Sequence, residues 1–392
     1  MRVIINQSTA LGAKTGVGQY TFELLRELRG LAPDDTFGVF PPAWTAKLLR
    51  LGQALRPARR PEASRDGGGG TLATWMRIAG TGALTDYLRL TSILGRYELY
   101  HEPNHIPLAC ALPTVATLQD LSVLVHPEWH PIDRVALYER EFEKGLRQCR
   151  HVLAISEFTR QEAIRVLGLP AERITTTPLG VRSDLAPQSA AQIATTLQRL
   201  GLPSGYLLYV GTIEPRKNLE MLMRAYCDLP LHARERCPLV LAGAWGWNSA
   251  ECRAYYDEHA RQANILHLGY VADADLAALY GGASALLLPS HYEGFGLPPL
   301  EMMACGGAVI TSTADALVEV VGSRAHQLPP DDLPAWRDAM QRIILDDAWR
   351  QELCDGAIEL SRTFSWNRCA RQTFDVYRSV LREASSTTKL AG

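Results

Sequence analysis

The chain has 392 residues, of which 47% are apolar and 21% charged, and its formal net charge is −2. This composition is that of a folded globular protein, and its charge gives no bulk attraction to nucleic acid or to a membrane. Because the chain is too long for one ordinary hydrophobic core, we expect two domains of at most about 200 residues each.

The cysteines and the chain start indicate the compartment. The eight cysteines form no Cys-x-x-Cys pair and have no regular spacing, which predicts free thiols in a reducing environment rather than disulfides or a metal site. The apolar start at 1–6 is too short for a signal peptide, and no apolar run approaches the length of a membrane span. We therefore expect a cytoplasmic protein.

Residues 2–6 predict a parallel strand, followed by a turn that contains Gly16 and Gly18 and by a helix that stops at Gly30. The glycines allow a ligand to approach the backbone, although Thr21 stands where a dinucleotide-binding fingerprint needs a third glycine or alanine. A tight turn that serves packing alone explains the same residues equally well.

A second strand is predicted at 36–40, after which the pattern loosens over about 43–95 and includes four consecutive glycines at 67–70. We expect a mobile insertion there. Between 43 and 90 it carries eight basic and three acidic residues, interleaved with tryptophan, leucine, methionine and isoleucine. A solvated basic loop is the simpler interpretation; a lipid-linked acceptor would instead favour contact with an anionic membrane surface.

Strands predicted at 97–101 and 115–118 each end in polar residues, at the edge where a doubly wound sheet binds its ligands. The second of these ends leads into Gln119 and Asp120, and both loops are candidate site loops. Four nearby histidines are alternatives, although a lone histidine near a strand end is more often structural and their spacing does not suggest a metal site: His101, His105, His126 and His130.

Two more strands, at 151–155 and 174–177, complete the first sheet, and Ser156 is predicted to cap the helix between them. A second domain follows after a linker, and a last amphipathic helix ends the chain. We place the N-terminal domain, the linker, the second domain and the C-terminal helix at 1–185, 186–203, 204–370 and 371–392, respectively.

The second domain is predicted to open with a buried strand at 206–212, whose C-terminal end leads to Arg216 and Lys217. An arginine offers a planar fork and a lysine a point charge, so the pair suits a diphosphate at the ligand-binding edge of the sheet. Pairing of one of these cations with Glu214 or Glu220 is an equally good alternative. Asn218 is predicted to cap the helix that follows.

An Asp-x-Asp sequence at Asp273 and Asp275 has the form of a metal-binding motif. It directly precedes a predicted helix at 276–280, so helix capping is the better interpretation.

An apolar run at 285–289 predicts a buried strand, followed by a glycine turn and a helix that starts at tandem prolines 298 and 299. The amides of Phe295, Gly296 and Leu297 would then be unpaired donors at the positive end of the helix dipole. This arrangement predicts an anion site.

Two carboxylates, Glu293 and Glu301, flank that helix start, and Gly294 between them leaves room for a ligand. A diphosphate would be repelled by bare carboxylates, so they suit hydroxyl groups or a developing positive charge. Alternatively, Glu301 is a first-turn acid that satisfies the helix dipole and Glu293 is a solvated loop residue.

Glu293, seven intervening residues and Glu301, with Gly-Phe-Gly-Leu-Pro between them, resemble the donor-site signature of family 4 of the retaining glycosyltransferases. The runs at 155–159, 178–181 and 211–218 are also similar to segments of that family, and only about 43–95 and the tail after 385 lack the resemblance. The resemblance implies the GT-B fold: two α/β, Rossmann-like domains facing across a cleft, with the last helix returning to the first domain.

The resemblance also implies roles for particular residues. Arg216 and Lys217 are expected to neutralise a departing diphosphate without a metal, Glu293 to hold donor-sugar hydroxyls, and Asp120 to contact the sugar from the opposite domain. Further donor-binding residues are expected at Gly16, Gly18, Thr212, Tyr270, Val271, Gly294, Phe295, Gly296, Leu297 and Glu301, the last at the ribose hydroxyls. Gln119 departs from the family, whose members commonly have a histidine there, so no imidazole role is assigned to that position.

The implied function is transfer of a hexose to a glycan or lipid-linked acceptor in bacterial surface polysaccharide or O-antigen synthesis. The run at 211–218 is most similar to the branch of the family that transfers mannose from GDP-mannose. No cofactor is implied, and the expected place is the cytoplasm, with peripheral contact at the inner membrane surface. Two alternatives stay open: a transferase that uses GDP-rhamnose or a UDP- or dTDP-sugar, and a noncatalytic protein that binds a sugar nucleotide or glycan.

Overall fold

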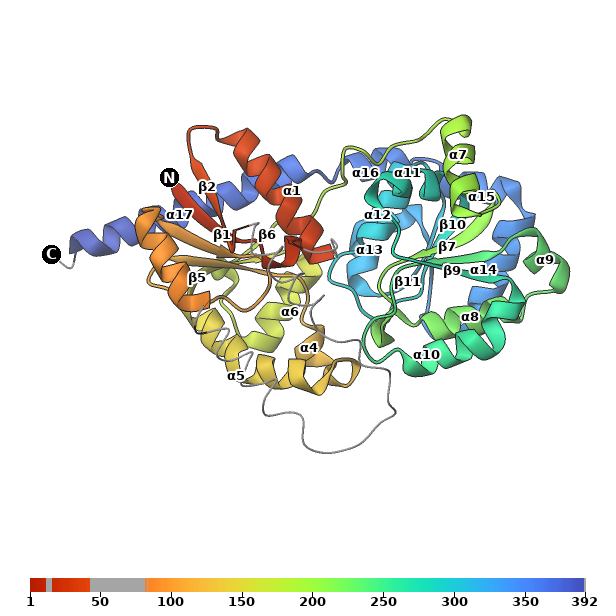
Figure 1. The fold of residues 1–392 in the computed structure, drawn as a ribbon, viewed down its shortest axis with the longest axis horizontal. Coiled ribbons are helices and arrows are strands. Elements are labelled where there is room, and N and C mark those ends of the chain that lie inside the picture. Colours follow the sequence, from red (N-terminus) through yellow and green to blue (C-terminus); the bar gives the residue numbers. More distant parts are fainter. Residues whose placement is uncertain (12–15, 43–81, 83, 391–392) are drawn as a thin grey trace, which may run out of the picture.

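The computed structural model describes residues 1–11, 16–42, 82 and 84–390, and side chains up to 386. Two α/β domains lie side by side (Figure 1). Within the described residues, the first sheet has six parallel strands in the order β2-β1-β3-β4-β5-β6. These strands are β1 (Arg2–Asn6), β2 (Thr36–Phe40), β3 (Leu99–Glu102), β4 (Thr114–Leu118), β5 (Cys149–Ala154) and β6 (Ile174–Thr176).

The second sheet is also parallel, with the described strands in the order β12-β11-β10-β7-β8-β9. They are β7 (Tyr206–Val210), β8 (Leu239–Ala242), β9 (Ile265–Gly269), β10 (Ala283–Leu288), β11 (Val309–Ser312) and β12 (His326–Leu328). The two sheets confirm the predicted α/β class with two Rossmann-like domains.

Helices cover both sheets. In the first domain they are α1 (Gly16–Leu31), an unlabelled helix at 84–94, α4 (Ser122–Val125), α5 (Ile132–Gln148) and α6 (Glu157–Leu167). In the second they are α7 (Ala190–Leu200), α8 (Leu219–Cys227), α9 (Leu231–Arg236), α10 (Ala250–Tyr255), α11 (Asp273–Gly282), α12 (Leu297–Ala304), α13 (Asp315–Val321), α14 (Leu333–Leu345), α15 (Asp347–Cys354) and α16 (Ala357–Arg362), before α17 (Trp366–Leu390). Within the described chain, none of the helices combines the length and hydropathy needed to cross a bilayer.

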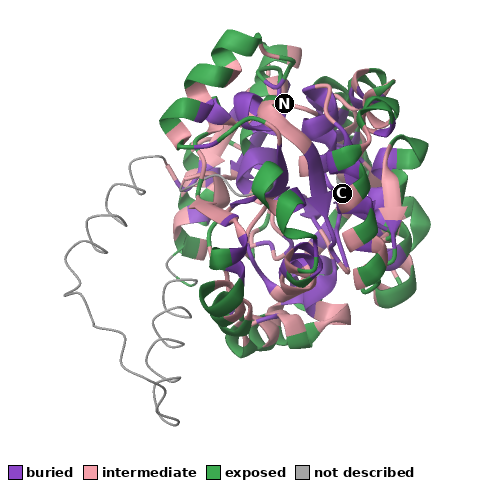
Figure 2. Cartoon of the chain, turned by 90° about the vertical axis from the view of Figure 1, so that its right-hand side faces the viewer, coloured by how far each residue is buried: buried purple, intermediate pink, exposed green. Residues whose placement is uncertain are grey.

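The strands are apolar because helices shield both faces of each sheet. Every residue of β4 and of β8 is buried, as expected for parallel strands with no solvent-facing side. Figure 2 shows these buried strands inside helices whose outer faces are exposed. The C-terminal ends of β7 and β10, which are neighbours in the second sheet, bring two site loops together.

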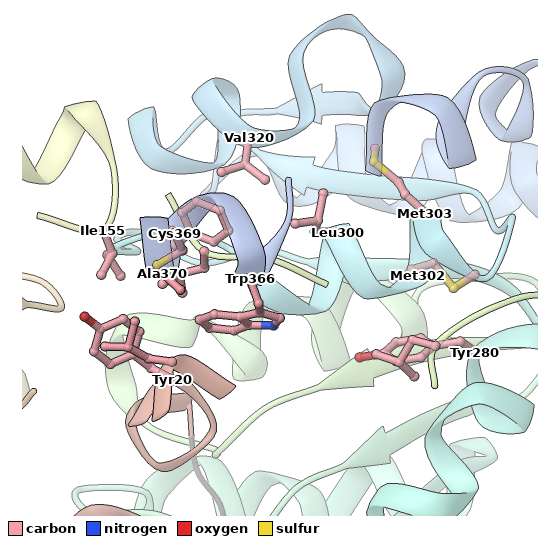
Figure 3. Packing of buried hydrophobic residues seen from close by; sticks show 14 of the residues in the cluster. Tyr20, Ile155, Tyr280, Leu300, Met302, Met303, Val320, Trp366, Cys369 and Ala370 are labelled. Atoms are coloured by element: carbon pink, nitrogen blue, oxygen red, sulfur yellow. The ribbon is translucent and has the colours of Figure 1, made fainter. Parts of the chain in front are cut away.

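The helix α17 links the two domains into one core. It begins at Trp366, ahead of the boundary expected at 371, and runs beside α1 of the first domain (Figure 1). The Trp366 ring lies 6.2 Å from that of Tyr20, centroid to centroid, and the Tyr377 hydroxyl is 2.6 Å from Nδ1 of His101. Figure 3 shows Trp366 between side chains of both domains, Tyr20 on one side and Leu300 on the other.

Three local expectations need comment. Most of the expected insertion, 43–81 and 83, lies outside the described residues. Its last part, 84–94, is a helix whose Leu88 is buried against Ile4 and Tyr100, so the expectation of a mobile segment up to 95 was wrong there. Ser156 caps α6 as predicted, accepting from the Thr159 amide at 3.0 Å. Asn218 occupies the N-cap position of α8 as predicted, but its side chain makes no capping bond and instead donates to the Pro330 carbonyl oxygen at 2.8 Å.

Candidate active site

Glu293 is the centre of a buried ion network at the C-terminal edge of the second sheet. It lies in the loop after β10, and Arg216 and Lys217 come from the turn after the neighbouring strand β7. Arg216 Nη1 is 3.0 Å from Glu293 Oε2, the Lys217 ammonium contacts Oε1, and the Ser290 hydroxyl donates to Oε1 at 2.7 Å. Adjacent strands therefore assemble a carboxylate with three donors.

The charges in this network balance. Arg216 also pairs with Glu214 at 2.7 Å, so two cations face two carboxylates. Burial alone would raise the pKa of Glu293, which is 6% exposed, but Lys217 and Arg216 lower it, so the group is ionised. The alternative of an ion pair with a nearby glutamate is also met, since Arg216 pairs with Glu214, but this pair is buried rather than at the surface, and Glu220 pairs with Arg224.

Between Glu293 and the first turn of α12, three consecutive backbone N–H groups are left free by the described residues and can bind a ligand. The amides of Phe295, Gly296 and Leu297 donate to no acceptor within the described part of the chain. Gly296 has φ 115°, a left-handed conformation that favours glycine. The prolines predicted at the first turn of the helix follow directly. This end of α12 has the properties of an anion site.

At residue 294 the backbones of the two domains approach each other closely. A Cβ on Gly294 would lie 1.8 Å from the Gln119 carbonyl oxygen of the first domain. The Gly294 carbonyl oxygen accepts from the hydroxyls of Ser156 at 2.7 Å and Thr159 at 3.2 Å. The α6 amides of Glu157 and its neighbour 158 also donate to the Glu319 carboxylate of α13, each at 2.8 Å. The start of α6 thus holds the site loop of the other domain.

Asp120 faces this network from the first domain. Its Oδ1 accepts from the Ser122 amide at 3.0 Å and from the Ser122 hydroxyl at 2.8 Å. Burial would raise the pKa of Asp120, but the Arg216 guanidinium, the His105 ring and the two bonds from Ser122 together lower it. The structure therefore brings Asp120 within the electrostatic reach of Arg216.

The histidines near this loop fall into two groups. His101 is buried between Thr117 and Tyr377, which bond its two ring nitrogens, so its role is structural. His105 and His130 instead lie beside Asp120, and each has a buried Nδ1 with no hydrogen-bond partner among the described residues. Sequence alone left these histidines undistinguished, because only their partners separate them.

Glu301 occupies a second buried position on α12. It is 8% exposed, its Oε2 accepts from the Tyr280 hydroxyl at 2.7 Å, and burial raises the pKa of Glu301 to about 7. Arg182 lies nearby and pairs with Asp184 and Asp273. The sequence did not predict that Tyr280 and Arg182 would lie near Glu301, because each is remote from it along the chain.

The remaining predicted donor residues are more scattered. Gly18 is a close approach, since a Cβ there would lie 2.6 Å from the Thr9 carbonyl oxygen, whereas Gly16 has open space. Thr212 follows β7 and its carbonyl accepts from a tyrosine hydroxyl at 3.2 Å. Tyr270 is 57% exposed at the end of the edge strand β9, and Val271 packs on the core. None of these joins the Glu293 network within the described residues.

A cavity of about 190 Å³ lies against Glu293 between the domains. It is lined by Phe158, His291, Tyr292, Glu293, Thr313, Ala314, Asp315 and Pro330. Tyr292 bridges the domains, because its hydroxyl accepts from the Leu121 amide at 3.0 Å and contacts Glu162.

The Asp-x-Asp sequence forms neither a helix cap nor a cluster of metal ligands. Ala272 occupies the N-cap position of α11, so the capping prediction was wrong. Asp273 lies 3.2 Å from Arg182, and Asp275 pairs with Arg199. Across 1–11, 16–42, 82 and 84–390, no group of three or more histidine, cysteine, aspartate or glutamate side chains could hold a metal ion.

Two family models match successive parts of the chain. One, described as Glycosyltransferase Family 4, matches residues 15–185, and the other, Glycosyl transferases group 1, matches 198–359. O-antigen chain mannosyltransferase B of Escherichia coli is 34% identical over 384 residues, 96% of this chain and 100% of that protein. Serotype-specific mannosyltransferase WbdA of Escherichia coli is 33% identical over 237 residues, 59% of this chain and 29% of that longer protein.

Solved structures share the whole fold. Sucrose-phosphate synthase from Thermosynechococcus elongatus superposes with a TM-score of 0.72 at 20% identity, covering 98% of this chain and all of that one. WaaG, described as a glycosyltransferase involved in lipopolysaccharide biosynthesis, gives 0.69 at 14% identity, covering 96% and 99%. The full-length relative and the two family models make the conclusion plain: the chain belongs to glycosyltransferase family 4 and is a retaining hexosyltransferase with the GT-B fold.

Proposed function

We propose that this enzyme transfers mannose from GDP-mannose to a glycan or lipid-linked acceptor in the assembly of an O-antigen type of surface polysaccharide. The assignment of mannose as the transferred sugar is based on the full-length similarity to O-antigen chain mannosyltransferase B. The donor base rests on the run from Gly211 to Asn218, which resembles the branch of the family that uses GDP-mannose.

In this proposal, the main task of the site is to stabilise the departing diphosphate. The bond from the anomeric carbon to the phosphate oxygen breaks, and the acceptor hydroxyl bonds that carbon on the same face while its proton passes to the released phosphate. Arg216, Lys217 and the free amides at 295–297 offer positive potential for that negative charge as it develops.

Because the ion network is already neutral, the diphosphate has to exchange partners within it. When Arg216 and Lys217 turn to phosphate oxygens, the Glu293 carboxylate is released to accept hydrogen bonds from sugar hydroxyls. Asp120 offers a second acceptor from the first domain, and the Glu301 Oε1, which receives no hydrogen bond from the described residues, suits a ribose hydroxyl. Tyr270 and Val271 are the proposed edge of the base site.

The test is nucleotide release from a panel of GDP-, UDP- and dTDP-sugars, GDP-mannose among them, by the purified enzyme. We expect release of GDP from GDP-mannose, reduced about 100-fold or more by Lys217→Ala and by Glu293→Gln. Arg224→Ala is the matched control, because Arg224 also pairs with a glutamate but lies exposed on α8. Release from a different donor would replace the mannose assignment, and binding without release or transfer would favour a noncatalytic binder.

We also propose that the first domain contacts the cytoplasmic face of the inner membrane. The helix at 84–94 exposes Leu90, Ile93 and Leu94 on one face, the last two at 74% and 75%. Arg89 and Arg96 are exposed on or just after the same helix, where they suit anionic headgroups. The basic residues expected at 47–77 lie outside the described residues.

Co-sedimentation with vesicles that contain phosphatidylglycerol tests this contact. We expect wild-type protein to sediment with the vesicles and the double variant Ile93→Ser, Leu94→Ser to lose most of that binding. Leu231→Ser is the matched control, because Leu231 is 61% exposed but belongs to the second domain. Equal binding by the double variant and the control would overturn the proposal.

A further inference from the structure

Gln119, at the position where the family commonly has a histidine, has its amide nitrogen engaged within the first domain. Its Nε2 donates to the Pro103 carbonyl oxygen at 2.9 Å, and the side chain is buried inside the first domain.

His130 lies close to the loop that contains Gln119 and Asp120, although it comes from a later part of the chain. Its Nε2 is 3.0 Å from the Ser122 hydroxyl, which in turn donates to Asp120 at 2.8 Å. From the second domain, the Trp247 ring stacks on the His130 imidazole, with 6.0 Å between the ring centroids. His130 thus lies between the domains, next to a residue already proposed to meet the sugar.

The hydrogen-bond directions fix the tautomer of His130. The single hydroxyl proton of Ser122 points at the ionised Asp120, so Ser122 Oγ has only lone pairs left for the imidazole. Nε2 must therefore carry the proton. Burial and the nearby Arg134 and Arg216 lower the pKa of His130 to about 4, although Asp120 opposes this, so the ring is neutral and Nδ1 is a bare acceptor.

That acceptor is buried and has no hydrogen-bond partner in the described part of the chain. His130 is only 6% exposed, so bulk water does not satisfy the nitrogen either. Buried acceptors are nearly always paired in folded proteins, and one left open between two domains of a transferase is suited to a ligand hydroxyl. Because Nδ1 and Nε2 lie on opposite sides of the ring, the open nitrogen points away from Ser122.

We propose that His130 binds a hydroxyl of the transferred hexose through Nδ1, with Ser122 and Asp120 fixing the ring, and so determines which sugar the enzyme accepts. This inference rests on the proposed function, because it takes the hexose of the sugar nucleotide to lie between Asp120 and Glu293. His130 binds a hydroxyl that does not react, so its contribution belongs to donor affinity rather than to the chemical step.

Two substitutions separate the two ring nitrogens. In His130→Gln the side-chain amide reaches the Nε2 position and keeps a donor for Ser122 but removes the Nδ1 acceptor. In His130→Asn an oxygen occupies the Nδ1 position and the bond to Ser122 is lost. His151→Gln is the control, because His151 lies in β5, bonds Thr175 of the neighbouring strand β6 and makes no ring contact with Trp247 among the described residues.

The measurement is kcat and KM for the donor and for its four singly deoxygenated hexose analogues. The reference donor is whichever sugar nucleotide the wild-type enzyme turns over, so a wrong mannose assignment leaves this test intact. We expect His130→Gln to raise KM for the reference donor about tenfold with little change in kcat. For the one analogue that lacks the recognised hydroxyl, KM should be the same for His130→Gln as for the wild-type enzyme. His130→Asn should retain more of that discrimination. An equal loss with every analogue, a loss in kcat alone, or kinetics like those of the control would overturn the proposal.

Discussion

Replacing Gly294 with alanine should disable the enzyme by holding its domains apart. The added Cβ would lie 1.8 Å from the Gln119 carbonyl oxygen, whereas Cβ atoms essentially never approach within 3.0 Å, so the two backbones must separate by about 1.2 Å or more. Neither partner is a flexible side chain, so the clash cannot be relieved locally. Moving the loop also weakens the bonds from Ser156 and Thr159, each worth about 1 kcal/mol.

The consequence for catalysis is larger than the consequence for folding. A displacement of about 1 Å in a site costs about 100-fold in rate, because Glu293 and Asp120 come from opposite sides of the contact. Each domain keeps its own sheet, so the melting temperature should fall only modestly. Turnover of the sugar nucleotide measures the first effect, and small-angle X-ray scattering should show a larger radius of gyration.

The matched control for this experiment is Gly30→Ala. Gly30 lies in α1 near its end, where an added Cβ meets no atom within 4 Å, so this variant should be neutral or slightly stabilised. If Gly294→Ala retained wild-type kcat/KM and an unchanged scattering profile, the close approach at Gln119 would not be part of the active arrangement.

Three other positions test separate parts of the structure. Trp366→Ala should lower the free energy of unfolding by about 3–5 kcal/mol in urea titrations, since the ring fills the core between the domains, and a loss under about 1 kcal/mol would contradict this. Trp247→Phe keeps a ring on His130 but loses the indole bond to the Trp129 carbonyl, so its turnover should exceed that of Trp247→Ala; the reverse order would show that the stack is unimportant. Glu301→Gln tests how the stability of the protein depends on pH. The pKa of Glu301 is about 7 in the native state and 4.5 in the unfolded state, so between these two pH values the native state binds more protons than the unfolded state. The free energy of unfolding of the wild-type protein should therefore fall by about 3 kcal/mol as the pH rises from 4.5 to 7. Thermal melts of both proteins should favour the variant more at about pH 8 than at about pH 5, and a constant difference would refute the raised pKa.

Much of the fold could be predicted because parallel sheets have a simple pattern. Strands buried on both faces give continuous apolar runs, and the glycine and proline residues at 294–299 mark the start of α12. Details that depend on tertiary partners were missed. Asn218 has a typical capping residue type, yet its side chain is taken by Pro330, more than a hundred residues further along the chain. Asp273 was likewise expected to cap α11, but Arg182 attracts it instead.

The site was predictable where its members share one sheet edge. Glu293, Arg216 and Lys217 follow neighbouring strands, so their meeting follows from topology. Residues contributed by domain contact were not predictable. His130 was one of four candidate histidines in the sequence, and only its bond to Ser122 and its stack on Trp247 distinguish it, because no local spacing encodes an approach between separate sheets.

This division of the site has a mechanistic consequence. The diphosphate-binding groups and Glu293 belong to one domain, whereas Asp120 and His130 belong to the other, and Gly294 lies where they meet. In the proposed mechanism, binding a diphosphate only exchanges partners in a network whose charges already balance, so that step by itself gives little selectivity between sugars. The sugar hydroxyls meet acceptors from both domains only when the approach at Gly294 is complete. The recognised hydroxyl therefore adds to donor affinity in that arrangement, and a donor that lacks it should show a raised KM with little change in kcat, although its diphosphate meets the same groups.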